Sequence, residues 1–395
     1  MPPKKVVEEK KVLLGRPGNN LKSGIVGLAN VGKSTFFQAI TRSPLGNPAN
    51  YPFATIDPEE ARVIVPSDKL EKLVEIYKPK SIVPAHITLY DIAGLTKGAS
   101  AGEGLGNAFL SHIRAVDAIY QVVRCFDDAE IIHIEGDVNP VRDLEIISNE
   151  LRLKDIEFAE KHLESVLKLT KKGGQSLEVK QKKEEAVLVE RIIQLLKDGN
   201  RVANQNWTPK EVEVINSMLL LTAKPSIYLI NLSERDYVRK KNKHLASIKE
   251  WVDKYSPGDV IIPFSVSLEE KLSHLETDEE RAEEEEKIGA KSQLPKIILT
   301  MREKLNLQSF FTAGEDECRA WTVRKGTKAP QCAGVIHGDL EKTFIQALVY
   351  KYDDIIEYGD EKAVQAAGKL QIKGKDYVVE PDDICFFKAG AGKNN

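Results

Sequence analysis

The sequence predicts an α/β protein that ends in a smaller α+β module. Three observations support this fold class: an apolar strand around Ile25 and Val26 that runs into a glycine-rich loop and a helix, apolar residues at helical intervals between positions 140 and 205, and short β-rich runs separated by turn residues after position 305. We therefore expect an N-terminal tail over residues 1–20, an α/β domain over residues 21–290 with an inserted antiparallel helical hairpin at about 140–205, and a β-grasp-like module over residues 305–389.

The composition is typical of a globular protein. The chain has 395 residues, of which 42% are apolar and 30% charged, so it is long enough to bury a core. No apolar run approaches the ~20 residues that span a bilayer, and the start MPPKKVVEEKK lacks the apolar core of a signal peptide, so we expect a cytoplasmic protein without a membrane partner. The net charge of -3 restricts nucleic-acid contact to local patches, and no DNA partner is expected. The cysteines lack metal-ligand spacing and are expected to be single thiols: Cys125, Cys318, Cys332 and Cys385.

The strongest local pattern is Gly27-x4-Gly32-Lys33-Ser34, which lies between a short apolar strand and a stretch that can open a helix at Thr35. This is a P-loop in its required setting of strand, loop and helix. Its glycines let successive backbone N–H groups point at phosphate oxygens, and the helix N-terminus adds a favourable dipole. Lys33 would neutralise the β and γ phosphates, and Ser34 would offer its hydroxyl to Mg²⁺. The sequence therefore predicts a nucleoside triphosphatase of the Ras-like G-domain type.

A second phosphate-side segment follows in ITLYDIAGLTKGASAGEGLGNAF. Its strand ends at Asp91, which would hold Mg²⁺ through a water, and the Gly94 N–H is expected to meet the γ-phosphate. The many glycines that follow leave the next loop free to change conformation, as in a nucleotide switch. Upstream, YPFATIDP places Thr55 where its hydroxyl can reach the same ion, so the predicted magnesium ligands are Ser34, Thr55 and Asp91.

Leu95 stands where Ras-like GTPases have a glutamine that positions water. An aliphatic side chain cannot orient water, so hydrolysis must use another group or be slow. One hypothesis is that Asn30 helps to hold a monovalent cation, K⁺, where negative charge develops; the alternative is that Asn30 stabilises the loop turn. Equal turnover in potassium and in sodium would exclude the cation.

The base-binding segment is expected at NLSERD, after the apolar run KPSIYLI. GTPases carry Asn-Lys-x-Asp at such a place, and their aspartate accepts hydrogen bonds from guanine. Here Leu232 replaces the lysine and Glu234 the aspartate, which misaligns a guanine site, and unsatisfied polar groups discriminate strongly. Asn231 can still meet the purine ring nitrogen, and the Leu232 carbonyl is an acceptor for the adenine amine. With Ser265 opening a last base-side loop over residues 265–267, the segment favours ATP.

Together, GLANVGKST, PFATIDP, DIAGLTKGASAGEGLGNAFL and NLSERDYVRKKNKHL resemble the YchF, or Obg-like ATPase, family of the translation-factor P-loop class, over residues 21–388. The resemblance implies an ATPase that also takes GTP less well, with Ser34 and Thr55 on magnesium and Leu232 at the adenine. It places the phosphates among Asn30, Val31, Gly32, Lys33, Ser34 and Thr35. Several members carry a hydrolysis-linked histidine in the strand after the switch loop, where this chain has Gln121. That glutamine either positions water or is an ordinary polar residue of the strand.

The insert and the C-terminal module are read from periodicity and composition. Apolar residues near helical spacing predict two long helices joined at Gly173-Gly174: Leu144, Ile147, Leu151, Ile156, Leu163 and Leu167 in the first, then Leu188, Ile192 and Leu195 in the second. The many lysines and glutamates of these helices form either a solvated face or a partner surface. ETDEERAEEEEK predicts an acidic helix, and a further helix is expected near Glu341–Val349. The last module resembles the TGS domain that ends this family.

Two basic stretches are candidates for RNA contact. One is RKKNKH, directly after the base-binding segment, which is weak evidence at this length. The other combines Arg324, Lys325 and Lys328 with Trp321 and His337 in the C-terminal module, a mixture that suits RNA or ribosome contact. His337 alone is better explained as a histidine that satisfies a turn.

These observations predict an ATP-dependent switch that hydrolyses the β–γ bond with Mg²⁺ and engages the ribosome, its large subunit or rRNA. The first alternative is a GTPase of ribosome assembly with the same phosphate site. The second is a nucleotide-gated binding module whose slow hydrolysis is incidental, as Leu95 would allow.

Overall fold

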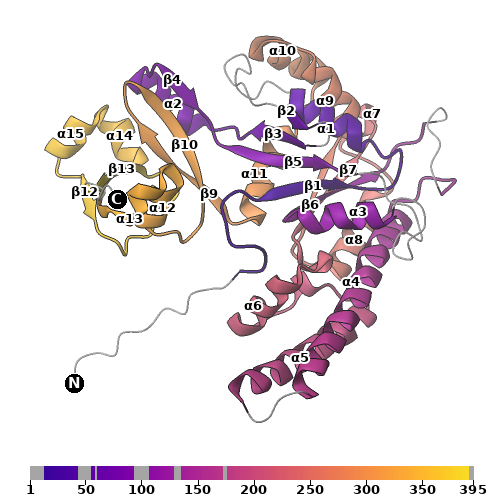
Figure 1. Ribbon diagram of the computed structural model, residues 1–395. Coiled ribbons are helices and arrows are strands. Elements are labelled where there is room, and N and C mark those ends of the chain that lie inside the picture. The colour runs from indigo at the N-terminus through magenta and orange to yellow at the C-terminus, as the bar shows by residue number, and fades with distance from the viewer. Residues whose placement is uncertain are drawn as a thin grey trace. The chain divides into compact units, whose positions relative to one another are not determined.

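The computed structural model describes residues 13–42, 55–57, 60–92, 106–128, 135–171 and 176–390 (Figure 1). The chain divides into two compact units. The first contains the segment that ends at Pro17, together with Gly24–Thr35 and Asp91–Ser267; the second contains Gly18–Ser23, Phe36–Tyr90 and the chain from Leu268 onward. Among the described residues, no helix has the length and apolar character that a membrane span requires.

The larger sheet has seven strands in the order β2-β3-β5-β1-β6-β7-β8. Its parallel part aligns Arg124, the last residue of β6, with Asn231 of β7, and Asn231 with Phe264 of β8. Every residue of β6 and β7 is buried, as expected for central parallel strands covered on both faces. β3 pairs antiparallel with β2 and β5, so the sheet is mixed. The strand bounds are β1 Lys22–Val26, β2 Thr55–Asp57, β3 Glu60–Ile64, β5 His86–Asp91, β6 Ala118–Arg124, β7 Ser226–Asn231 and β8 Val260–Phe264.

Helices connect these strands in the way that an α/β fold requires. The P-loop leads into α1, and the polypeptide between β6 and β7 contains the long helices of the insert. The bounds are α1 Lys33–Arg42, α3 Gly106–Ala115, α4 Pro140–Lys171, α5 Leu177–Lys197, α6 Pro209–Met218, α7 Glu234–Arg239, α8 Leu245–Tyr255 and α9 Val266–Ser273, with short 3₁₀ turns η3 at Val202–Asn204 and η4 at Leu221–Ala223.

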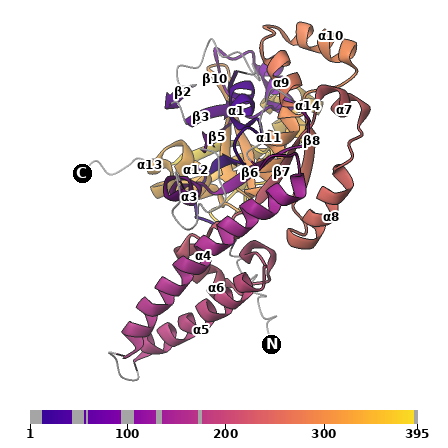
Figure 2. The same ribbon diagram turned by 90° about the vertical axis from the view of Figure 1, so that its right-hand side faces the viewer.

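The predicted helical hairpin is confirmed by α4 and α5, which lie side by side and run in opposite directions (Figures 1 and 2). Its seam is a buried apolar cluster that includes Ala159, Val189 and Ile192. The predicted stripe is wrong at one position, because Leu167 is 38% exposed whereas its neighbour Val166 is buried. The connection at Gly173-Gly174 falls outside the described residues.

The second unit contains a six-stranded sheet in the order β12-β11-β13-β9-β10-β4. β9 and β10 form an antiparallel hairpin, and β13 runs parallel to β9 as in a β-grasp arrangement. One face of this sheet is covered by α12 around a cluster that includes Phe310, Val323 and Cys332. The strands are β4 Ser81–Val83, β9 Leu307–Ala313, β10 Glu317–Arg324, β11 Phe344–Tyr350, β12 Gln371–Lys373 and β13 Ile384–Ala389. The helices are α2 Asp68–Tyr77, α10 Asp278–Ile288, α11 Leu294–Lys304, α12 Ala329–Ile336, α13 Gly338–Lys342, α14 Tyr352–Tyr358 and α15 Glu361–Ala366.

One helix expected in this unit is a strand. The helix predicted near Glu341–Val349 is α13, which ends at Lys342, and the residues that follow form β11. The sequence FIQALVY is apolar at intervals that fit either structure, and pairing of β11 with both β12 and β13 decides the outcome. The acidic helix is confirmed as α10, where Thr277 and Glu280 form a capping box.

Candidate functional site

The loop between β1 and α1 leaves no space for side chains at two of its glycines. A Cβ on Gly27 would lie 2.7 Å from the Val122 carbonyl oxygen, and one on Gly32 would lie 2.7 Å from Nδ2 of Asn231. Gly32 also has φ +99°, a conformation that other residues rarely adopt. The motif's glycines are therefore required by packing of the phosphate loop against β6 and against the end of β7.

Lys33, the first residue of α1, is held inside this loop. Its side chain is 7% exposed, and Nζ donates a hydrogen bond to the Leu28 carbonyl oxygen at 2.6 Å. Burial lowers the pKa of the Lys33 ammonium to about 8, and the negative charge of Asp91 partly opposes that shift. A phosphate anion beside the ammonium would restore its usual pKa, so the site is suited to a polyanion.

Asn231 connects three loops at the end of the parallel strands. Its Nδ2 donates to the Val31 carbonyl oxygen at 3.0 Å, and its Oδ1 accepts from the Val266 N–H at the start of α9, also at 3.0 Å. The side chain is almost completely buried. Because an amide nitrogen carries two hydrogens, the second remains for an acceptor on a ligand. Asn231 thus fixes the phosphate loop relative to the expected base-side loops.

Leu232 is directed into the core. It is 2% exposed and belongs to a buried cluster with Val123, Trp251 and Val252, while its backbone N–H donates to the Phe264 carbonyl oxygen at 2.8 Å. In the Asn-Lys-x-Asp motif of GTPases, the aliphatic part of the lysine packs on the base. The buried Leu232 side chain cannot make this contact, so only the backbone of Leu232 is available to a ligand. Glu234 begins α7, a short helix that is capped by the side chain of the preceding serine.

The expected loop over residues 265–267 is shorter than predicted. β8 ends at Phe264 and α9 already begins at Val266, so Ser265 alone separates the strand from the helix. Ser265 is fully buried, and its Oγ lies 3.0 Å from Oγ of Ser267. The hydrogen bond from the Val266 N–H to Asn231 keeps this junction next to the phosphate loop.

The predicted magnesium ligands are only partly described. Asp91 is the last residue of β5, and Ser34 is the second residue of α1, with an exposed side chain. Thr55 lies in β2, but its side chain falls outside the described part of the structure, as does all of Gly94. Within the described ranges, no group of three or more His, Cys, Asp or Glu side chains is arranged for a metal. A hydroxyl and a carboxylate fit Mg²⁺, which takes most of its other ligands from phosphates and water.

Asn30 and Gln121 were the candidates for assisting hydrolysis. Asn30 is exposed with φ 61°, a left-handed conformation that asparagine tolerates, which agrees with a role in the turn. Gln121 is 5% exposed in the middle of β6 opposite Tyr228, three residues before the strand ends at Arg124. The next residue, Val122, faces the phosphate loop with its carbonyl oxygen at the position of Gly27, so a role of Gln121 in positioning water stays a hypothesis beside that of an ordinary polar residue of the strand.

Arg124 is a residue that the sequence reasoning missed. It is 1% exposed at the end of β6, and its guanidinium donates to the carbonyl oxygens of Phe126 and Asp128 at 3.1 and 3.4 Å. The sequence contained a signal for this residue, namely a charged side chain inside the apolar run AIYQVVRCF. An arginine in such a run is buried only where specific partners bind it.

Both basic stretches contain residues that make structural contacts within their own units. In RKKNKH, Asn242 Nδ2 donates to the Cys125 carbonyl oxygen at 3.0 Å and to Asp236 Oδ2 at 2.7 Å. In the second unit, Lys328 pairs with Asp376 at 2.7 Å. His337 caps α13 by accepting from the Asp339 N–H, which confirms the turn interpretation of this histidine.

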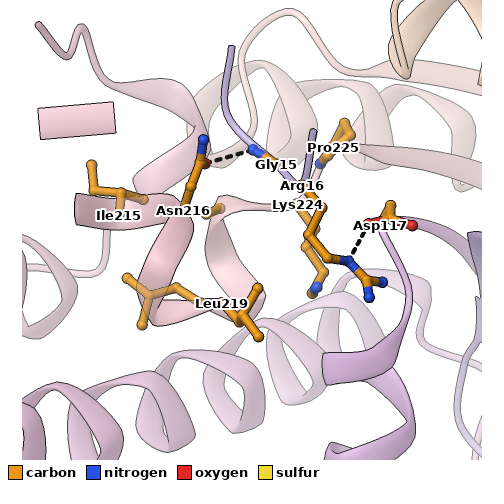
Figure 3. Close-up of a pocket in the computed structure, with 10 residues that line it drawn as sticks. Gly15, Arg16, Asp117, Ile215, Asn216, Leu219, Lys224 and Pro225 are labelled. Carbon is orange, nitrogen blue, oxygen red and sulfur yellow. Dashed lines mark hydrogen bonds and ion pairs between the residues drawn. The ribbon is translucent and has the colours of Figure 1, made fainter. Parts of the chain in front are cut away.

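A small pocket in the first unit lies beside η4 and α6 (Figure 3). Its polar groups bind one another: Arg16 Nε lies 2.8 Å from Asp117 Oδ1, and the Gly15 N–H donates to Asn216 Oδ1 at 2.7 Å. Lys224, whose pKa burial lowers to about 8, donates to the carbonyl oxygens of Arg114 and Val116. These contacts hold the N-terminal segment in place and satisfy the polar groups of the pocket within the protein.

Comparison with known proteins covers almost the whole chain. A family model described as a 50S ribosome-binding GTPase matches residues 22–156, and the C-terminal YchF-GTPase model, described as a protein of unknown function, matches residues 307–390. Proteins called Obg-like ATPase 1 are 76% identical over 395 residues in Saccharomyces cerevisiae, with 100% of both chains covered, and 51% identical in Homo sapiens over 392 residues, with 98% of both covered. The solved structure of the Schizosaccharomyces pombe YchF GTPase matches with a TM-score of 0.89 and 61% identity over 96% of this chain and 100% of that chain.

Proposed function

Because the chain belongs to the Obg-like ATPase, or YchF, family of P-loop nucleotide hydrolases, we propose that it hydrolyses ATP in preference to GTP. The observation that carries the base preference is the burial of Leu232, which is 2% exposed in the core. A GTPase places a lysine there and an aspartate two residues later, whereas this chain has Glu234. Guanine would leave its ring N–H and amine poorly matched, a mismatch that discriminates strongly in a closed site.

The proposed mechanism depends on positioning and charge and needs no covalent intermediate. Successive backbone N–H groups from Asn30 to Thr35 would surround the phosphates, and the Lys33 ammonium would lie against the β and γ oxygens as negative charge develops. Asn231 keeps this loop in place from the base side. The Gly94 N–H is assigned to the γ-phosphate.

A bound Mg²⁺ would supply positive charge against the β and γ phosphates, and Ser34, Thr55 and Asp91 are proposed to hold it. On the base side, the Leu232 carbonyl is assigned to the adenine amine, and Ser265 to the loop that closes the site. A contribution of K⁺ at Asn30 stays a hypothesis, tested by comparing turnover in potassium and sodium.

The experiment that tests this function is phosphate release from Mg-ATP and Mg-GTP by the purified full chain. We expect faster turnover of ATP at limiting concentration, loss of turnover with EDTA, and loss of both activities in Lys33→Met. Lys210→Met, an exposed lysine of α6, is the matched control and should hydrolyse ATP like the unmodified protein. A higher kcat/KM for GTP would contradict the ATP assignment and favour the GTPase alternative.

We propose further that the nucleotide state controls binding to the large ribosomal subunit in the cytoplasm. Two observations support this proposal: the matching family model is named for 50S ribosome binding, and the sequence of the C-terminal module resembles a TGS domain of translation proteins. Co-sedimentation with large subunits should be stronger with a non-hydrolysable ATP analogue than with ADP. Equal sedimentation in both states would exclude a nucleotide switch on that partner. The domain boundaries 21–290 and 305–389 stay a proposal, which limited proteolysis would test.

A further inference from the structure

Arg124 is the largest side chain that the described core buries almost completely. A charge in that environment is stable only when its hydrogen bonds are supplied by the protein. Two of these go to the backbone of the residues that directly follow the strand: Nε donates to the Phe126 carbonyl oxygen at 3.1 Å and Nη2 to that of Asp128 at 3.4 Å. The guanidinium also lies over the Phe126 ring, 4.6 Å from its centroid. Arg124 therefore shapes the segment Cys125–Asp128.

This segment begins next to the proposed base site. Arg124 is aligned with Asn231 in the sheet, and the Cys125 N–H donates to the Asn231 carbonyl oxygen at 2.9 Å. Segments that follow neighbouring parallel strands emerge at the same edge of a sheet, which is where ligands bind in α/β folds. On its other side, the Cys125 carbonyl oxygen accepts from Asn242 Nδ2 at 3.0 Å. The segment is thus fixed from within by Arg124 and from outside by Asn242.

We propose that Arg124 is a positioning residue for base discrimination, which keeps Cys125–Asp128 as a rigid wall beside the nucleotide base. The inference rests on the proposed function only for the identity of the preferred nucleotide. The forked guanidinium reaches two carbonyl oxygens at once, and lysine cannot reproduce this geometry although it keeps the charge. Loosening the wall affects contacts to the base and leaves contacts to the phosphates in place.

The test is the ratio of kcat/KM for Mg-ATP to that for Mg-GTP in Arg124→Lys. We expect this ratio to move towards unity by about tenfold, mainly through a higher KM for the preferred nucleotide with kcat little changed, since about 1.4 kcal/mol of lost binding is tenfold. Inhibition by magnesium tripolyphosphate, which has no base, should be unchanged. A general loss of stability would lower turnover of both nucleotides equally and leave the ratio as it was.

A matched control is Arg201→Lys. The Arg201 side chain is also largely enclosed, at 10% exposure, but it lies at the opposite end of the sheet, where it donates to Ser256, Asp259, Lys224 and Ser226 at 2.6–3.0 Å. Its substitution should lower stability and leave the ATP to GTP ratio unchanged. If Arg124→Lys does not fold, Asn242→Ser loosens the same segment from its other side and should shift the ratio in the same direction.

Each outcome decides. An unchanged ratio in a folded Arg124→Lys protein, or in Asn242→Ser where that is the variant that folds, overturns the proposal. Equal weakening of tripolyphosphate and ATP also overturns it, because the effect would then act through the phosphate loop. Preference for GTP in the unmodified protein contradicts the ATP assignment alone, and a shift of the ratio would still support the role of Arg124.

Discussion

Replacing Asn231 by aspartate changes one atom of the proposed site and should weaken nucleotide binding strongly. The two side chains have the same shape, so Oδ1 can still accept from the Val266 N–H at 3.0 Å. The other position, which donates to the Val31 carbonyl oxygen at 3.0 Å, becomes a carboxylate oxygen facing that carbonyl. A hydrogen bond is therefore replaced by repulsion between two acceptors in a buried place.

The cost of this change is the loss of the bond plus an unsatisfied and charged buried acceptor, about 2–4 kcal/mol in total. If the phosphate loop yields to relieve it, the affinity for Mg-ATP falls by about 30- to 1,000-fold. The carboxyl group can escape by taking up a proton and donating to Val31, so the loss should shrink at acidic pH. Titration calorimetry of Asn231→Asp at pH 7.5 and pH 5.5 measures both effects.

Asn216→Asp provides a matched control in the same unit. Asn216 also bridges two backbone groups, donating to the Leu13 carbonyl oxygen at 3.0 Å and accepting from the Gly15 N–H at 2.7 Å (Figure 3). Its substitution should destabilise the protein but leave the affinity for Mg-ATP within about twofold, because distant sites behave independently. The reasoning is refuted if Asn231→Asp binds Mg-ATP like the unmodified protein at pH 7.5, or if both variants lose affinity equally.

Three further predictions concern buried ionisable groups. The folded pKa of Lys33 is about 8, so above pH 8 the amine must take up a proton before it can pair with the phosphates, and nucleotide affinity should fall by about tenfold per pH unit. Calorimetry in buffers of different ionisation enthalpy should detect this proton uptake at pH 9. Absence of proton uptake would contradict the role assigned to Lys33. Asp155→Ala removes the acceptor for the N–H groups of Leu221 and Thr222 and for the Thr222 hydroxyl, so urea unfolding should show a loss of about 3 kcal/mol or more; a loss below about 1 kcal/mol would contradict this role. Burial raises the pKa of Glu269 from 4.5 to about 7, so this group's contribution to stability is complete below pH 4.5 and is lost as the pH rises through 7. The difference in unfolding free energy between the unmodified protein and Glu269→Gln should therefore change across that window, and a constant difference would refute the pKa shift.

The parts of the fold that the sequence could predict are those with strong local signals. The phosphate loop was predictable because its glycines are fixed by backbone geometry, as the close approach of Gly32 to Asn231 demonstrates. The hairpin was predictable because its apolar residues repeat over many turns. The family identification and the α/β fold are confirmed by the comparisons, while the individual nucleotide and metal contacts stay predictions.

The errors lie where tertiary contacts decide between local alternatives. Residues 344–350 fit a helix or a strand by periodicity, and only pairing with two neighbouring strands makes them β11. The side-chain direction of Leu232 depends on Trp251 and Val252, which are distant in sequence, so no local pattern encodes it. The burial of Arg124 had a local signal, a charged residue inside the apolar run AIYQVVRCF, but only the structure identifies its partners. The burial of Leu232 also decides which variant can test the base preference. Leu232→Lys would bury a charge in the core, so its effect on nucleotide binding would include an effect on folding.

The central claim is that the site prefers adenine, and a competition titration of Mg-ATP against Mg-GTP tests it most directly. The comparison should include Glu234→Asp, which leaves the buried cluster around Leu232 intact. The account predicts tighter binding of ATP to the unmodified chain and a shift towards GTP in the variant. Tighter binding of GTP to the unmodified chain would contradict the claim, and the protein would then be a GTPase whose guanine contacts lie elsewhere.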